Sequence, residues 1–383
     1  MITTKTIQRF REIPTPFYFY DLEVLDSTCQ TVRDESVKAG FKIHYAVKAN
    51  ANPRLLKIIS GYGFGADCVS FNEIERAIST GFKPSEVVFA GVGKTDKDIE
   101  AALRTGILCF NCESIAEIEV INSIAEKLNK VATIALRINP NVEAHTHKYI
   151  TTGIPESKFG INTWELPEVL GRLSALKNVI LKGIHFHIGS QITKMSVFKS
   201  LCSRINELQD WFLSQNIDLQ IINVGGGLGI DYTDPDKPAK FEDYFSMIKE
   251  FVTLRPGQHI HAEPGRSLVG QCGSLISRVL YIKKGSNTTF AIIDAGMTDL
   301  IRPALYQAHH QIVNLTSVGI ISRYDVVGPV CESADTFAKF VELPETKRGD
   351  IVAIRSAGAY GESMASRYNL RDLPGTVFSN ELS

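Results

Sequence analysis

The chain has 383 residues and a formal net charge of -1 at pH 7, with 44% hydrophobic and 22% charged residues. This composition is typical of a folded globular protein and argues against a disordered chain. The balanced charge and the lack of a basic run argue against nucleic acid as a partner.

The amino-terminal stretch Met1–Phe17 has no apolar core of signal-peptide length, and no later window resembles a membrane-spanning run. The seven cysteines show no framework spacing, which fits reduced thiols better than disulfides. Cys109 and Cys112 have the spacing of half a metal site, but no second pair accompanies them. We therefore expect a cytoplasmic protein with no membrane partner and no metal.

Between Phe41 and Arg266, short apolar and β-branched runs alternate with longer amphipathic stretches, which is the pattern of alternating strands and helices. The predicted strands are Lys42–Lys48, Phe64–Val69, Val87–Ala90, Ile107–Asn111, Thr133–Ile138, Leu181–His187, Ile221–Val224 and His259–Glu263. The predicted helices include Ser70–Thr80, Thr95–Thr105, Ser114–Leu128, Met195–Ser214 and Phe241–Phe251. Ser70 and Glu73 have the spacing of a capping box. The pattern predicts a (β/α)8 barrel over residues 25–268, with a doubly wound sheet as the second choice.

After the barrel, the sequence becomes rich in strands and lacks long helices. The predicted strands are Ser274–Ile282, Thr289–Ile293, Gln311–Leu315, Asp325–Val327, Lys339–Leu343 and Ile351–Arg355. These segments predict a separate β domain over residues 269–383. The strand-like run Phe17–Tyr20, within residues 1–24, is expected to pair with this domain.

Lys48 ends the first predicted barrel strand. A lysine at the end of an apolar strand is unexpected, because a protein core normally excludes it. The loops after the strands build the active site of such barrels. There a lysine can lose its proton and condense with an aldehyde, as the lysines that carry pyridoxal phosphate do. A lysine that extends to solvent from the strand end explains this segment equally well.

Other polar residues end predicted strands at the same side of the barrel, which favours the chemical interpretation of Lys48. They are Asp67, Arg137, Asn139, His187, Ser190, Gly225–Gly227, Glu263 and Arg266. Glu263 is placed to pair with a pyridine nitrogen, or else to form a salt bridge with Arg266. The glycine run is suited either to a phosphate or to a tight turn. His185 is expected to be structural, whereas His187 is placed to lie against a flat ring.

The motifs together resemble the fold-type III pyridoxal-phosphate-dependent decarboxylases over nearly the whole chain. The resemblance rests on Tyr45–Asn50, His187–Gln191, Gly225–Gly227, Glu263–Arg266, Arg302–Tyr306, Gly328–Ser333 and Ala359–Gly361. It implies an alanine-racemase-like barrel joined to a β domain, with pyridoxal 5'-phosphate as the cofactor. It also implies a homodimer whose active sites lie at the subunit interface.

The resemblance also assigns roles around the cofactor. Lys48 would bind it covalently, with Asp67 nearby, His187 would stack on its ring, and Glu263 would pair with its pyridine nitrogen. The phosphate would be held by Ser190, Gly227, Gly265 and Arg266, with Tyr360 close by.

For the substrate, the resemblance implies meso-diaminopimelate, which would be decarboxylated to L-lysine and carbon dioxide in the last step of lysine biosynthesis. Arg266, Arg302 and Tyr306 would bind carboxylates, with Tyr360 beside them, and Glu332 would bind the distal ammonium. Cys331 of the other subunit would protonate the carbon that has lost carbon dioxide.

Three alternatives remain at this point. One is a decarboxylase of the same family that acts on ornithine, arginine, lysine or carboxynorspermidine. Another is a non-catalytic pyridoxal-phosphate-binding regulatory protein, and the third is an alanine racemase, whose motifs fit less well. The chain departs from the family pattern at Cys68–Glu73, where relatives are usually richer in glycine.

Overall fold

The computed structural model describes residues 2–142 and 158–382. The chain forms two compact units. The first, here called the barrel unit, comprises Cys29–Gly229 and Lys240–Gly265. The second, called the β unit, comprises Met1–Thr28, Ile230–Ala239 and Arg266–Ser383. Among the described helices, none has the length and apolar content that crossing a bilayer requires.

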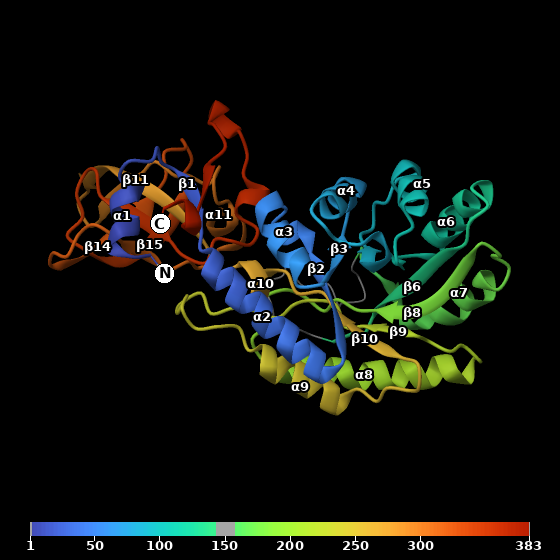
Figure 1. The fold of residues 1–383 in the computed structure, drawn as a ribbon. Helices are drawn as coiled ribbons and strands as arrows, with labels where there is room; N and C mark the ends of the chain where they lie inside the picture. The colour runs from blue at the N-terminus through green and yellow to red at the C-terminus, as the bar shows by residue number, and fades with distance from the viewer. Residues whose placement is uncertain (1, 143–157, 383) are drawn as a thin grey trace. The chain divides into compact units, whose positions relative to one another are not determined.

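The barrel unit is built on a closed ring of parallel strands (Figure 1). The strand order β5-β4-β3-β2-β10-β9-β8-β6 is completed by pairing between β5 and β6, and β7 extends β6 outside the ring. The strands are β2 (Phe41–Ala46), β3 (Gly65–Cys68), β4 (Val87–Phe89), β5 (Cys109–Cys112), β6 (Ala132–Asn139), β7 (Ile161–Asn162), β8 (Val179–His185), β9 (Ile221–Asn223) and β10 (His259–Ala262). The predicted barrel is confirmed, and the alternative of a doubly wound sheet is wrong.

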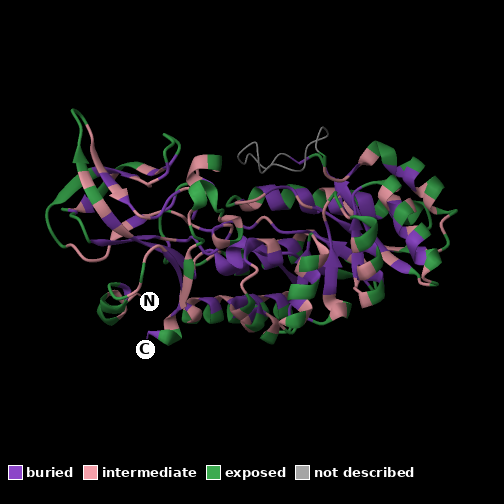
Figure 2. Cartoon of the chain, turned by 90° about the horizontal axis from the view of Figure 1, so that it is seen from above, coloured by how far each residue is buried: buried purple, intermediate pink, exposed green. Residues whose placement is uncertain are grey.

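Helices surround these strands and carry the exposed polar residues on their outer faces (Figure 2). They are α2 (Leu22–Ala39), α3 (Pro53–Gly61), α4 (Phe71–Ser79), α5 (Asp96–Thr105), α6 (Ile115–Lys127), α7 (Leu166–Leu173), α8 (Met195–Ser214) and α9 (Phe241–Phe251), of which α2 begins in the β unit. Short 3-10 turns are η1 (Val47–Ala49), η2 (Pro84–Glu86) and η3 (Thr163–Glu165). Helices α2, α3 and α7 lie outside the stretches predicted above.

Side-chain caps fix where several helices begin. Thr95 and Asp98 form a reciprocal capping box at α5, and Gly106 ends that helix in the left-handed conformation. The capping box predicted at Ser70 is only half formed. The Ser70 hydroxyl accepts from the Glu73 N–H at 3.3 Å, but the Glu73 carboxylate accepts from the N–H of Val69 at 2.8 Å. Glu73 therefore holds the residue before the cap.

The β unit contains a mostly antiparallel sheet in the order β13-β16-β11-β12-β14-β15. Strand β1 pairs antiparallel with β11 and parallel with β17, so the pairing predicted for Phe17–Tyr20 is observed. The elements are α1 (Thr4–Phe10), β1 (Phe17–Tyr20), α10 (Arg266–Val269), β11 (Gly273–Lys284), β12 (Thr289–Ile293), α11 (Arg302–Tyr306), β13 (Ile312–Asn314), β14 (Ile321–Val327), β15 (Thr336–Pro344), β16 (Ile351–Ile354), η4 (Glu362–Met364), η5 (Tyr368–Leu370), β17 (Gly375–Phe378) and η6 (Ser379–Glu381).

An aromatic cluster joins helix α1 to this sheet. The ring of Phe10 meets Phe17 and Phe19 edge to face, at centroid distances of 5.4 and 5.0 Å. Ile276 and Ile351 from the neighbouring strands are fully buried in the same cluster. Burial of these large side chains stabilises the position of the amino-terminal segment on the sheet.

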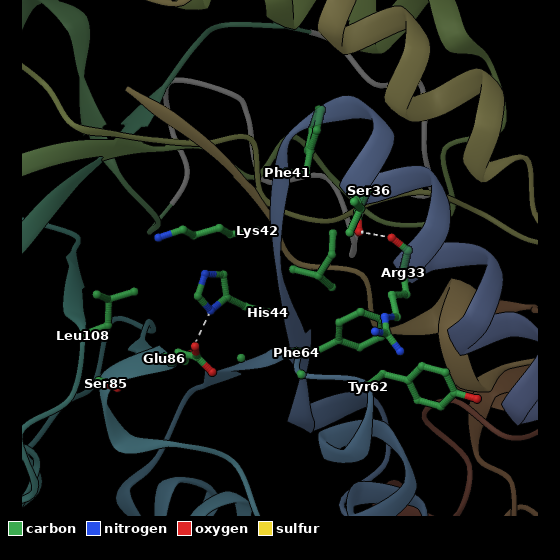
Figure 3. Close-up of a pocket in the computed structure, with 14 residues that line it drawn as sticks. Arg33, Ser36, Phe41, Lys42, His44, Tyr62, Phe64, Ser85, Glu86 and Leu108 are labelled. Atoms are coloured by element: carbon green, nitrogen blue, oxygen red, sulfur yellow. Dashed lines mark hydrogen bonds between the residues drawn. The ribbon is translucent and has the colours of Figure 1, made fainter. Parts of the chain in front are cut away.

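Two buried histidines on adjacent strands of the barrel, His44 on β2 and His261 on β10, contact each other. The Nε2 of His44 lies 2.8 Å from the Nδ1 of His261, and the Nδ1 of His44 donates to the Glu86 carbonyl at 3.0 Å. This network makes His261 the donor and His44 the acceptor, so both rings are neutral. A cavity of about 240 Å³ lies beside His44 and is lined in part by Lys42 and Leu108 (Figure 3).

This histidine pair predicts a loss of stability in acid. Burial lowers the pKa of His44, and burial together with His44 lowers the pKa of His261 to about 2, whereas an unfolded histidine has a pKa of 6.5. Below pH 6.5 the unfolded chain binds more protons than the folded chain, so stability falls as the pH falls.

We expect His261→Asn, which keeps a donor toward His44 but cannot titrate, to lose about 2 kcal/mol less stability than the wild type between pH 7 and pH 5. Urea unfolding at the two pH values measures this difference. His259→Asn, at an exposed position of the same strand, serves as the control. Equal acid sensitivity of the wild type and His261→Asn would rule out the pair as its source.

Candidate active site

Lys48 lies directly after strand β2, at the carboxyl end of the barrel strands. Its Nζ is 2.7 Å from the Oδ2 of Asp67 on β3, and the Lys48 side chain keeps 36% of its surface exposed. Asp67 is fully buried, and burial together with the Glu263 carboxylate raises its pKa, which Lys48 partly offsets. The amine is therefore oriented by one buried acid and remains accessible to a bound molecule.

Glu263 follows strand β10 and is held by side chains from three other strands of the barrel, β5, β8 and β9. Its Oε1 accepts from Asn223 at 2.7 Å and from Asn111 at 3.3 Å, and its Oε2 accepts from the Nε2 of His185 at 3.0 Å. Burial alone would raise the pKa of this carboxyl, but His185, Lys48 and Asn223 lower it well below its usual value. Glu263 is thus a buried carboxylate that stays ionised.

The end of β10 packs tightly against the turn that carries Lys48. The N–H of Ala46 donates to the Pro264 carbonyl at 3.1 Å. A Cβ on Gly265 would lie 3.0 Å from the Cβ of Ala46 and 3.1 Å from that of Ala49. Glycine at this position therefore lets the segments that carry the lysine and the carboxylate approach each other.

His187 lies in the turn after β8. Burial, followed by the charges of Arg137 and Lys48, lowers its pKa well below 6.5. The ring is therefore neutral at physiological pH, which suits contact with the face of an aromatic cation. A Cβ on Gly226 would lie 3.8 Å from the Cε1 of His187 and only 2.4 Å from the Glu263 carbonyl oxygen.

The turns that contain Ser190 and Gly227 lie side by side. The N–H of Ile192 donates to the Gly227 carbonyl at 2.8 Å, and the N–H of Gly229 donates back to Ile192 at 2.9 Å. These bonds bring together two segments predicted to hold a phosphate. The φ angles of Gly225 and Gly227 are positive, at 71° and 112°, which also fits the alternative explanation, a tight turn.

Two buried ion pairs support these strand ends. The side chain of Lys94 is fully buried, and its Nζ lies 2.7 Å from Glu117 and 3.0 Å from the carbonyl of Asn111. Arg137 pairs with Glu113 at 2.7 Å, and the Glu113 N–H donates to Glu117 at 2.8 Å. The network links the strand that carries Asn111 to the strand that carries Arg137.

The barrel residues fit pyridoxal phosphate. An amine, an ionised carboxylate and a neutral ring are the groups needed for its aldehyde, its pyridine nitrogen and its face. The Oδ1 of Asp67 and the Nδ1 of His185 are buried and have no hydrogen-bond partner in the described parts of the chain. In the same residues no cluster of metal-binding side chains occurs, and the buried Cys109 and Cys112 thiols have raised pKa values.

In the β unit, the predicted residues Arg266 and Arg302 meet at one tyrosine. The Nη1 atoms of Arg266 and Arg302 donate to the Tyr232 hydroxyl at 2.6 and 2.8 Å. The guanidinium of Arg266 also lies 4.9 Å from the ring centroid of Tyr360. Both arginines are at least 90% buried, so this unit presents concentrated positive charge.

Cys331 and Glu332 lie in the turn between β14 and β15. The hydrogen bonds described for this turn do not involve Arg266 or Arg302. The turn is held by Asp335, which accepts from the N–H groups of Val330 and Met297 at 2.7 and 2.6 Å. Glu332 is exposed and accepts from the Tyr368 hydroxyl at 2.6 Å. Cys331 is exposed, whereas the other six cysteines are buried.

The structure adds residues that were not predicted from the sequence. His185, which was expected to be structural, contacts the Glu263 carboxylate directly. Asn111 and Asn223 complete the same carboxylate site, and a signal was present, since both are polar residues at the ends of apolar strands. For Tyr232, in the segment Ile230–Ala239, no strand or motif in the sequence gave a signal.

Comparison with known proteins identifies the chain's relatives. Residues 25–270 match the family model described as "Pyridoxal-dependent decarboxylase, pyridoxal binding domain". A diaminopimelate decarboxylase from Bacteroides thetaiotaomicron is 54% identical over 98% of both chains. One from Helicobacter pylori, strain J99, is 43% identical over 94% of this chain and 89% of its own.

Solved structures agree with this result. The crystal structure of Helicobacter pylori diaminopimelate decarboxylase complexed with L-lysine has a TM-score of 0.92 at 41% identity, and the match covers 97% of this chain and 93% of that one. The fold and the cofactor class predicted from the sequence are confirmed. By its family model and by relatives that match it almost end to end, the chain belongs to the pyridoxal-dependent decarboxylases.

Proposed function

We propose that the chain decarboxylates meso-diaminopimelate to L-lysine and carbon dioxide, the last step of lysine biosynthesis, with pyridoxal 5'-phosphate as its cofactor. The observation that carries the proposal is the pair of charged groups inside one barrel, the Lys48 amine beside Asp67 and the ionised Glu263. The names of the relatives supply the substrate.

When bound, pyridoxal phosphate supplies an electron sink for the electrons left behind when a carboxylate departs as carbon dioxide. Lys48 presents its Nζ to the aldehyde, and Asp67 orients that amine. Glu263 holds a proton on the pyridine nitrogen, because an ionised carboxylate stabilises the cation it faces. His187 covers the ring without adding charge, and Ser190, Gly227, Gly265 and Arg266 hold the phosphate, with Tyr360 beside them.

The substrate presents two carboxylates and two ammonium groups, so its site needs fixed charges of both signs. Arg266, Arg302 and Tyr306 bind carboxylates, and Tyr360 contributes beside them. Glu332 binds the distal ammonium. A decarboxylase for ornithine, arginine or lysine has no second amino acid group to bind, so the two buried arginines favour diaminopimelate.

Release of carbon dioxide tests the function directly. We expect the purified protein with pyridoxal phosphate to release carbon dioxide from meso-diaminopimelate and to form L-lysine, with at least about 100-fold less activity on ornithine, arginine or lysine. Lys48→Ala should abolish turnover while the circular dichroism spectrum stays unchanged. Lys42→Ala, which changes an exposed lysine on the preceding strand β2, should match the wild type.

Preference for another amino acid would reassign the substrate but keep the cofactor site. No carbon dioxide from any of them would favour a regulatory protein. Substantial turnover by Lys48→Ala would remove Lys48 from its role.

We also propose a cytoplasmic homodimer in which each active site receives Cys331 from the other subunit, where its thiol protonates the carbon that has lost carbon dioxide. Exposed apolar side chains on and beside the paired strands β14 and β15 support a protein partner, namely Val318, Ile320, Ile321 and Phe340. The exposure of the Cys331 thiol also fits a contribution to another subunit.

A mixed dimer tests this arrangement. Lys48→Ala and Cys331→Ala chains with different affinity tags are co-expressed, and the doubly tagged dimer is purified. Shared sites predict that the purified mixed dimer has about half of the wild-type activity, since one of its two sites is intact. Mixed dimers that form but show no activity above that of the parent variants would contradict sharing.

A further inference from the structure

Tyr232 lies in the segment Ile230–Ala239, which belongs to the β unit although its neighbours in the chain belong to the barrel unit. Gln271 donates to the carbonyls of Pro235 and Lys237, both at 2.7 Å, and Arg355 pairs with Asp236 at 2.8 Å. Within the segment, Asp231 Oδ1 accepts from the N–H groups of Thr233 and Asp234, both at 3.0 Å. The segment is therefore a preformed turn that holds Tyr232 in place.

The Tyr232 hydroxyl is an acceptor for two cations at once. It accepts from Arg266 at 2.6 Å and from Arg302 at 2.8 Å, and the Arg302 guanidinium also lies 5.0 Å from its ring centroid. A phenol oxygen has two lone pairs and one proton. With both lone pairs engaged, the remaining O–H is available to donate to a third, negatively charged group.

His310 fixes Arg302 from another direction. Its Nδ1 lies 2.9 Å from the Arg355 carbonyl and must donate there, so its Nε2 is the acceptor for the Nη1 of Arg302, also at 2.9 Å. Burial and then Arg302 lower the pKa of His310 to about 3, which keeps the ring neutral. The rings of His310 and Tyr232 are also in edge contact, with centroids 5.0 Å apart.

Together these bonds leave one edge of Arg302 for a ligand. Nη1 carries two N–H groups, and Tyr232 and His310 take both. The Nε of Arg302 is buried and has no hydrogen-bond partner, and no carboxylate pairs with Arg302 in the described ranges. The edge formed by Nε and Nη2 is the side of a guanidinium that binds a carboxylate with two parallel hydrogen bonds.

We propose that Tyr232 and His310 are positioning residues that turn the Nε–Nη2 edge of Arg302 toward a carboxylate of the substrate, and that the Tyr232 hydroxyl donates to the same carboxylate. This inference rests on the proposed function, since it takes an amino dicarboxylic acid as the ligand. An anion here also offsets the repulsion between two buried arginines. This arrangement selects for a substrate with a second carboxylate, because the donors of Arg302 and Tyr232 remain unpaired when the substrate lacks one.

Three variants and a control test the proposal. Tyr232→Phe keeps the ring but removes the hydroxyl, and His310→Leu removes the acceptor. His310→Gln keeps an acceptor near the position of Nε2, and the control His309→Leu changes the exposed neighbouring histidine. The readouts are KM and kcat for meso-diaminopimelate, and the Kd of pimelate for the holoenzyme by calorimetry. Pimelate has the two carboxylates but neither amine, and its binding does not depend on turnover.

We expect Tyr232→Phe and His310→Leu to raise KM and the pimelate Kd about 10-fold or more, with kcat changed less than about threefold. His310→Gln should recover most of the loss, and His309→Leu should equal the wild type. The cofactor absorbance spectrum should stay the same in all variants. If His310→Leu does not fold, Tyr232→Phe decides.

Values of KM and pimelate Kd in Tyr232→Phe and His310→Leu equal to those of His309→Leu would overturn the inference, as would a loss confined to kcat. If the wild type lacks activity on diaminopimelate but the variants weaken pimelate binding, the proposed substrate fails and the carboxylate site stands.

Discussion

The interior of the barrel depends on one buried charge, the Glu263 carboxylate. An ion in this environment is costly unless its hydrogen-bonding capacity is met. Here Asn111, Asn223 and His185 meet it from three different strands, which places constraints on β5, β8 and β9 simultaneously. The charge of Glu263 interacts with that of Lys48. It also raises the pKa of Asp67, the acid that pairs with this lysine. Strand register and site chemistry are thus set by the same contacts.

Each unit must stabilise buried charge, which is negative in the barrel unit and positive in the β unit. The barrel unit surrounds a buried anion with hydrogen-bond donors, and the β unit surrounds buried cations with neutral acceptors, Tyr232 and His310. In both cases a buried histidine contacts the charged group directly. Buried polar side chains hold the charges in place and leave their remaining hydrogen-bonding capacity for a ligand.

The parts of the fold and of the site that depend on local sequence patterns could be predicted. Alternating runs located every strand of the barrel, and Lys48 and Glu263 could be found because charged residues at the ends of apolar strands are unusual. The contact of His185 with Glu263 could not be predicted, because the two residues are 78 positions apart in the chain. The segment that carries Tyr232 has no periodic pattern, and its place in the β unit comes from tertiary contacts such as those of Gln271. Contacts between polar residues far apart in the chain could therefore not be predicted from the sequence.

The ionisation state of Glu263 tests this account most directly. Infrared difference spectra between the wild-type holoenzyme and Glu263→Gln, recorded at pH 7 and at pH 4.5, the ordinary pKa of a glutamic acid, isolate its carboxyl band. A pKa lowered by His185, Lys48 and Asn223 predicts a carboxylate band at both pH values, because the proton binds only in stronger acid. A protonated carboxyl band at pH 7 would contradict the account.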